Sequence, residues 1–281
     1  MSTQAREVPT GELLFLALEV AHAAGKLLVR GRPGSGRAAL AVDTKSSPTD
    51  IVTEMDRAAE ELITVQLAKA RPADAILGEE GADRPGTSGV RWVVDPLDGT
   101  VNYLYDLGGW AVSIAAEVGG RSVAGVVYVP SAGETFAAEL GGGATCNELP
   151  LRLGPGPALD RALVATGFGY HARRRAHQAA VLARVLPLVR DIRRFGACAV
   201  DLCSVASGRV DGYYERGVNP WDFAAGGLVA TEAGARVEGL RGAAPSDRFL
   251  LAAPPEVFGP LHDVLAAAGA DEGEGYAESE R

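Results

Sequence analysis

The most constraining feature of this sequence is an apolar run that ends abruptly in acidic residues. Residues 92–94 are followed at once by Asp95-Pro96-Leu97-Asp98-Gly99-Thr100. The apolar run is typical of a buried strand, and Pro96 forces an extended turn after it, so we expect Asp95 and Asp98 to converge. Gly99 permits a close backbone approach, and a helix can begin directly after it. The free N–H groups at the start of that helix would favour the binding of an anion.

Other acidic residues also stand at expected element ends, beside Gly or Pro. Gly78-Glu79-Glu80 follows the apolar run 75–78, and Asp222 precedes a helix that contains Ala224, Ala225 and Gly226. Those small residues would let the helix pack close to a sheet. Carboxylate and backbone carbonyl oxygens are the hard ligands that suit Mg²⁺. The sequence therefore predicts a metal site assembled from distant segments.

The remaining pattern predicts an α/β protein. Helical spacing is expected over 10–30 and from Thr53 to about residue 70, with a long loop over 31–50 between them. Segments 111–118 and 122–129 flank Gly119-Gly120, which predicts a hairpin. After that, expected strands and helices alternate; the strands are 162–166, 195–198, 212–215 and 249–253, and the helices are 176–189, 201–207, 221–233 and 261–268.

We expect one catalytic domain over residues 10–268, with an N-terminal half of about 10–153 and a C-terminal half of about 154–268. Residues 1–9 and the acidic segment 271–281 read as flexible tails. No low-complexity linker separates independent domains.

Composition indicates which binding partners and which cellular compartment to expect. The 281 residues carry 27 Lys and Arg against 36 Asp and Glu, a net charge of −9, which disfavours nucleic-acid binding. No apolar stretch is long enough to predict a membrane span. The three cysteines form no CxxC pair and no zinc spacing, which is typical of a reducing compartment, so we expect a cytoplasmic protein.

Taken together and in this order, the motifs resemble the inositol monophosphatase family. The resemblance rests on residues 95–100, on Gly78-Glu79-Glu80, on residues 221–226 and on the stretch from Lys45 to Asp56, and it runs from about residue 12 to about residue 268. It implies a layered αβαβα sandwich of the inositol monophosphatase and sugar phosphatase type. It also implies a Mg²⁺-dependent, lithium-sensitive phosphatase that forms a homodimer.

The resemblance also implies roles for individual residues. The metal ligands, for two to three Mg²⁺ ions, would be Glu79, Asp95, Asp98, Asp222 and the carbonyl of Leu97. Thr100, backed by Asp50, would orient the attacking water together with Glu79. The substrate would contact Asp98, Gly99, Thr100, Gly196, Ala197, Cys198, Glu215 and Asp222. Ala197 and Cys198 depart from the Ser-Ala that the family pattern leads us to expect, which leaves the exact alcohol open.

The function expected from this resemblance is hydrolysis of inositol 1-phosphate to myo-inositol and phosphate. The same chemistry on histidinol phosphate, fructose 1,6-bisphosphate or a 3′-phosphoadenosine nucleotide is the alternative. A different alternative is a regulatory partner-binding protein with secondary catalysis, which would have no need of the full acidic set.

Two other motifs need an interpretation of their own. Residues 167–172 match GxGxxA and sit between an expected strand and helix, as in a dinucleotide fingerprint, but the acid required after the next strand is missing. The run Arg173-Arg174-Arg175 is typical of a solvated helix start. Neither motif outweighs the acidic set.

Overall fold

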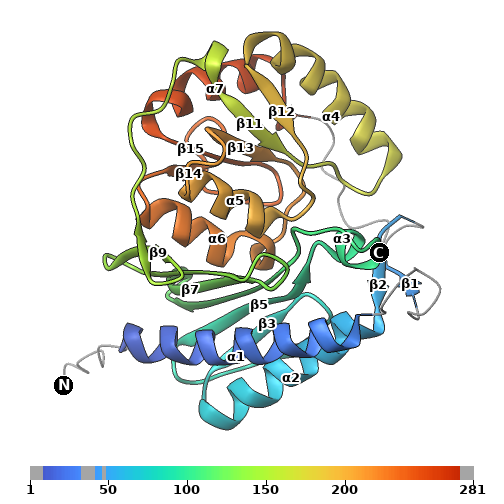
Figure 1. The fold of residues 1–281 in the computed structure, drawn as a ribbon, viewed down its shortest axis with the longest axis vertical. Coiled ribbons are helices and arrows are strands. Elements are labelled where there is room, and N and C mark those ends of the chain that lie inside the picture. Colours follow the sequence, from blue (N-terminus) through green and yellow to red (C-terminus); the bar gives the residue numbers. More distant parts are fainter. Residues whose placement is uncertain (1–8, 33–41, 46–48, 273–281) are drawn as a thin grey trace.

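Two β-sheets divide the molecule into alternating layers of helix and sheet (Figure 1). The structure is a computed structural model, and it describes residues 9–32, 42–45 and 49–272. Helices α1 (Thr10–Gly31) and α2 (Glu54–Ala70) cover one face of the first sheet. Helices α5 (Cys198–Ala206) and α6 (Pro220–Glu232) lie between the sheets, and α4 (Ala172–Val185) and α7 (Pro255–Ala267) lie beyond the second. The predicted αβαβα sandwich is confirmed.

The first sheet has eight strands in the order β10-β9-β8-β7-β6-β5-β3-β4. Only β3 and β5 run parallel; every other neighbouring pair is antiparallel. The strands are β3 (Ala75–Gly78), β4 (Asp83–Arg84), β5 (Val90–Asp98), β6 (Ala111–Val118), β7 (Arg121–Val129), β8 (Glu134–Glu139), β9 (Gly143–Cys146) and β10 (Leu149–Leu151). The predicted hairpin joins β6 to β7, and Gly119 and Gly120 both take positive φ in its turn.

The second sheet has five strands in the order β12-β11-β13-β15-β14. β12, β11 and β13 are parallel, whereas β15 and β14 are antiparallel to their neighbours. These strands are β11 (Leu163–Thr166), β12 (Asp191–Arg193), β13 (Gly212–Glu215), β14 (Arg236–Glu238) and β15 (Leu250–Ala253). Short 3₁₀ turns, η2 (Leu159–Arg161) and η3 (Leu186–Leu188), flank β11 and α4.

Three hydrophobic clusters fill the spaces between the five layers. One joins α1 and α2 to the first sheet, around residues such as Leu28, Ile63 and Trp92. The central cluster joins both sheets to α5 and α6, and the third joins the second sheet to α4 and α7. Each layer therefore buries apolar surface against its neighbours.

Small residues bring the central helices close to their neighbours. A Cβ atom at Gly125 of β7 would lie 3.0 Å from the Cα of Ala225 in α6. A Cβ at Gly226 would lie 3.1 Å from the carbonyl oxygen of Ala199 in α5. The predicted close packing of α6 on a sheet is thus confirmed, and α6 also packs tightly on α5.

The predicted strand 195–198 is wrong. Cys198 instead begins α5, and the strand beside β11 is β12 at Asp191–Arg193. Gly196 takes a φ of +97°, which breaks an extended run, and the side-chain amide of Asn102 donates to the carbonyl of Phe195 at 2.8 Å. The segment is therefore a bend rather than a strand.

The boundaries of other predicted elements also differ from those in the structure. The expected loop 31–50 contains β1 (Val42–Thr44), which pairs with β2 (Ile51–Thr53). Helix α4 begins four residues earlier than predicted and takes in the arginine run, and α7 begins before Pro260 rather than after it. The expected C-terminal tail begins too early, because Asp271 is buried and ion-paired with Arg241.

The rest of the expected C-terminal tail, 273–281, and most of the N-terminal one, 1–8, lie outside the described residues. No helix in the described ranges combines the length and the apolar character needed to cross a bilayer.

Replacing Gly125 by alanine should destabilise the central layer. The new methyl group would press on the backbone of Ala225, which cannot swing aside, so we expect a loss of about 1–3 kcal/mol in unfolding free energy. Gly11→Ala is the matched control, because no atom lies within 4 Å of the place that its new methyl group would take, and alanine favours a helix. Thermal unfolding of both variants measures the difference; equal melting temperatures would contradict the packing argument.

Candidate active site

Strand β5 presents the two central carboxylates. Every residue from Trp92 to Asp98 is buried, and the pairing of β5 with β6 shifts register between Asp95 and Asp98. Pro96 lies at that irregularity and has no N–H to give to the ladder. The sequence therefore ends regular pairing at the place where both acids stand.

Two further segments bring carboxylates to the same place. β3 runs parallel to β5, and the N–H of Glu79 donates to the carbonyl of Val94 at 3.1 Å, so Glu79 follows β3 beside Asp95. Asp222 lies in the first turn of α6, where its Oδ2 accepts the N–H of Asn219 at 2.6 Å. One oxygen each from Glu79, Asp95 and Asp222 lie within 4.8 Å of one another.

This crowding raises the pKa of the acids involved. Burial raises the pKa of Asp95 well above its ordinary value, and the neighbouring charges of Glu79, Asp98 and Asp222 raise it further. The pKa of Asp222 is raised by burial and then by Glu79 and Asp98. For Asp98 the pKa rises to about 7, chiefly through burial. Without a cation, these groups resist being ionised together.

The donor set fits a hard divalent cation. Three convergent carboxylate oxygens supply the charge and the oxygen ligands that such an ion prefers. Asp98 lies beside this group, and its Oδ2 accepts the N–H of Ala199 at 2.7 Å. The carbonyl oxygen of Leu97 lies 3.2 Å from Thr100 Oγ1. Metal ligation by Asp98 and by the Leu97 carbonyl stays a prediction.

The structure places Asp56, a residue to which the sequence analysis gave no role, behind Thr100. The Thr100 hydroxyl donates to Asp56 Oδ1 at 2.9 Å, and Asp56 Oδ2 accepts the N–H of Thr53 at 2.8 Å. Asp56 thus joins the cap of α2 to the start of α3 (Thr100–Leu104). The capping box of α2 turns the Asp56 carboxylate inward, where it is buried. A role for Asp50 itself stays a prediction.

The predicted substrate-side stretch lies against the same turn. A Cβ at Gly99, whose φ is +89°, would lie 3.1 Å from the Cβ of Ala197, so residues 196–198 pack on the Asp98–Gly99 turn. Glu215 ends β13 and is half-buried, and its charge raises the pKa of both Asp98 and Asp222. The structure therefore gathers these segments around the acids, and their roles in substrate binding stay predictions.

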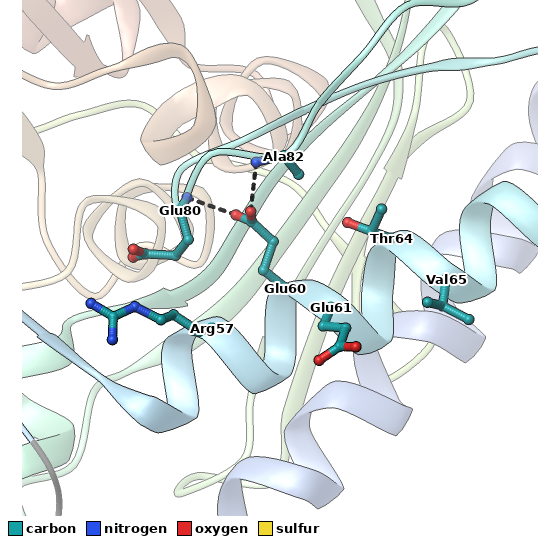
Figure 2. Close-up of a pocket in the computed structure, with 7 residues that line it drawn as sticks. All are labelled: Arg57, Glu60, Glu61, Thr64, Val65, Glu80 and Ala82. Carbon is teal, nitrogen blue, oxygen red and sulfur yellow. Dashed lines mark hydrogen bonds between the residues drawn. The ribbon is translucent and has the colours of Figure 1, made fainter.

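A buried glutamate of α2 holds the turn that carries Glu79 (Figure 2). Glu60 accepts the N–H of Glu80 at 2.6 Å and the N–H of Ala82 at 2.7 Å. On the other side, Lys45 Nζ lies 2.9 Å from Glu79 Oε1 and 2.5 Å from Glu80 Oε1. The adjoining hollow of about 260 Å³ is lined by Arg57, Glu60, Glu61, Thr64, Val65, Glu80 and Ala82.

Sequence reasoning missed Glu60 and named Asp56 only as the end of the family-like stretch that begins at Lys45. A usable signal was present, since the two acids are four residues apart and so share one face of α2. That face also carries the buried Ala59 and Ile63, and acids at core positions of an amphipathic helix need partners.

Glu60→Ala should loosen the Glu79 turn. It removes two charge-assisted hydrogen bonds and leaves the N–H groups of Glu80 and Ala82 without their acceptor, a loss of roughly 2–4 kcal/mol in unfolding free energy. We also expect a smaller rise in melting temperature on addition of Mg²⁺. Thermal scans with and without Mg²⁺ measure both effects. Glu61→Ala, the exposed neighbour on the same helix, is the control and should match the wild type.

Similarity to known proteins extends over most of this chain. A family model described as the inositol monophosphatase family matches residues 11–279. The inositol-1-monophosphatase SuhB of Mycobacterium tuberculosis is 51% identical over 215 residues, 73% of each chain. The Nus factor SuhB of Pasteurella multocida is 38% identical over 264 residues, 92% of this chain and 98% of the relative.

A solved structure shares the fold. The extragenic suppressor protein SuhB from Bartonella henselae superposes with a TM-score of 0.85 at 37% identity, covering 90% of this chain and 98% of that one. The chain therefore belongs to the inositol monophosphatase family and is an enzyme of the phosphoric monoester hydrolase class.

Proposed function

We propose that this enzyme is a Mg²⁺-dependent phosphatase whose preferred substrate is inositol 1-phosphate. The observation that carries the proposal is the convergence of Glu79, Asp95 and Asp222, within 4.8 Å, at the end of a buried strand. The names of the M. tuberculosis relative and of the family support inositol 1-phosphate as the first substrate to test.

The proposed Mg²⁺ ligands are carboxylates with one backbone oxygen. Two to three ions are expected, held by Glu79, Asp95, Asp98, Asp222 and the carbonyl of Leu97. When bound, Mg²⁺ would lower the pKa of a water molecule and neutralise negative charge on the phosphate. Uncatalysed hydrolysis of a phosphate monoester is extremely slow, so both contributions are needed.

The protein's own part in activating water falls to Thr100 and Glu79. Because the Thr100 hydroxyl donates its proton to Asp56, its oxygen lone pairs remain available to accept a hydrogen bond from water. Glu79 stands at the same site and can accept the second hydrogen. The pair would thereby fix the direction of attack on the phosphorus atom.

The alcohol part of the substrate would lie toward Glu215 and residues 196–198. Gly99 and Thr100 would carry the N–H groups nearest the phosphate. Histidinol phosphate, fructose 1,6-bisphosphate and a 3′-phosphoadenosine nucleotide remain alternatives, because the acid cluster recognises the phosphate rather than the alcohol.

Phosphate release from a substrate panel tests the proposal. We expect turnover of inositol 1-phosphate with Mg²⁺, no turnover after chelation, and recovery when Mg²⁺ is restored. The same assay on the three alternatives ranks the alcohols. Activity that survives chelation, or no release from any monoester, would refute the proposed function.

Thr100→Val should separate chemistry from folding. Valine keeps the shape of threonine but cannot orient water, so we expect kcat to fall by about 100-fold or more. Thr100→Ser keeps the hydroxyl and should retain most of the activity. Steady-state kinetics on inositol 1-phosphate measures both, and comparable rates for Val and Ser would exclude the hydroxyl from the mechanism.

Further properties belong to the same proposal. Inhibition by Li⁺ and a homodimer are expected from the family resemblance. A reducing, cytoplasmic setting is supported by Cys146, Cys198 and Cys203, which are all free thiols. A regulatory, partner-binding role would follow the name of the P. multocida relative, but the acidic cluster favours catalysis.

A further inference from the structure

The Glu215 carboxylate is held in a seat made by two other residues. The hydroxyl of Tyr213 donates to Glu215 Oε2 at 2.6 Å. On another side, a Cβ atom at Gly167 would lie 1.8 Å from Oε2 and 2.2 Å from Cδ of Glu215. The carboxylate therefore rests directly on the backbone of Gly167, and only glycine leaves the space that it occupies.

The strand geometry explains why Tyr213 reaches Glu215. The two residues are separated by one position in β13, so their side chains share a face of the sheet. Tyr213 belongs to the central cluster between the sheets, whereas Tyr214 belongs to the cluster on the other face. The side chain of Tyr213 is fully buried, so its ring cannot move without disturbing that core.

The Tyr213 hydroxyl also contacts the substrate-side stretch. Its phenol lies near the thiol of Cys198, the first residue of α5, and each of these two groups acts on the pKa of the other. Burial, followed by the nearby Cys198 and Glu215, raises the pKa of Tyr213, so the phenol keeps its proton and remains a donor. Tyr213 thus holds Glu215 through one buried hydroxyl and belongs to the same core cluster as Cys198.

The second oxygen of the Glu215 carboxylate can serve a ligand. The hydrogen bond from the Tyr213 hydroxyl uses Oε2, so it leaves the lone pairs of Oε1 able to accept a hydroxyl proton. The charge of this carboxylate also raises the pKa of Asp98 and of Asp222, so Glu215 and the acid cluster share one electrostatic environment.

We propose that Tyr213 is a positioning residue that fixes Glu215 to accept a hydrogen bond from a hydroxyl of the substrate's alcohol. The inference rests on the proposed phosphatase function. It also accounts for the Gly-Phe-Gly motif that resembles a dinucleotide fingerprint. Gly167 makes room for Glu215, and Gly169 makes room for Arg174, whose Cδ would lie 2.5 Å from a Cβ there.

The test compares Tyr213→Phe with Tyr214→Phe on two substrates. Inositol 1-phosphate offers hydroxyls to Glu215, whereas p-nitrophenyl phosphate offers none. Tyr214 is the matched control, because it is buried in the same strand and its hydroxyl has no hydrogen-bond partner in the described residues.

We expect Tyr213→Phe to raise KM for inositol 1-phosphate by roughly tenfold, with a smaller effect on kcat and on p-nitrophenyl phosphate. Tyr214→Phe should leave both substrates unchanged. Glu215→Gln should show the same substrate split, and adding Tyr213→Phe to it should change KM little further, because both act through one contact. Gly167→Ala, which pushes the carboxylate off its seat, provides a second variant with the same expected split.

Three outcomes would overturn the inference. An equal loss on both substrates would make Tyr213 a structural residue, unchanged kinetics on inositol 1-phosphate would remove it from recognition, and additive effects in the double variant would separate it from Glu215. If the wild-type enzyme releases phosphate from neither substrate with Mg²⁺, the proposed function itself fails, and that result is distinct from all three.

Discussion

Repulsion among buried carboxylates is the constraint around which this structure is organised. Asp95 is almost completely buried, and Glu79, Asp98 and Asp222 all raise its pKa. Placing several acids in a low-dielectric pocket costs free energy unless a cation or a donor balances them. The protein supplies the Lys45 ammonium to Glu79 and backbone N–H groups to two other acids, from Ala199 to Asp98 and from Asn219 to Asp222. The remaining excess of negative charge suits the pocket to a divalent cation.

The layered fold brings the two halves of this site together. Glu79 follows β3 and Asp95 lies in the neighbouring parallel strand β5 of the first sheet, whereas Glu215 ends β13 of the second sheet and Asp222 begins α6 between the two sheets. They meet because α6 packs against β7 and α5 without bulky side chains between them. The small residues of the central layer are therefore as necessary to the chemistry as the acids, since they set the distance between the two groups.

The supporting residues around the site were harder to find than the acids themselves. Asp95, Asp222 and Glu79 stand in short motifs that contain Pro or Gly. Such local motifs can be recognised from one sequence alone. Asp56 and Glu60 instead lie within a regular amphipathic helix, where an acid on the inner face is visible only once its partners are known. Likewise Gly196, with its positive φ, turns an apolar segment that resembles a strand into the entry of α5.

The sequence by itself determined the α/β class, the hairpin at Gly119-Gly120, and the acidic residues that surround the site, because each depends on local chemistry or on short-range periodicity. Only the tertiary structure decided that Asp56 supports Thr100, that Glu60 holds the Glu79 turn, and that Gly167 seats Glu215. Each of those contacts joins residues at least 20 positions apart in the chain, and depends on how whole layers pack. A local sequence pattern cannot predict such a contact, because the packing of whole layers positions many residues at once.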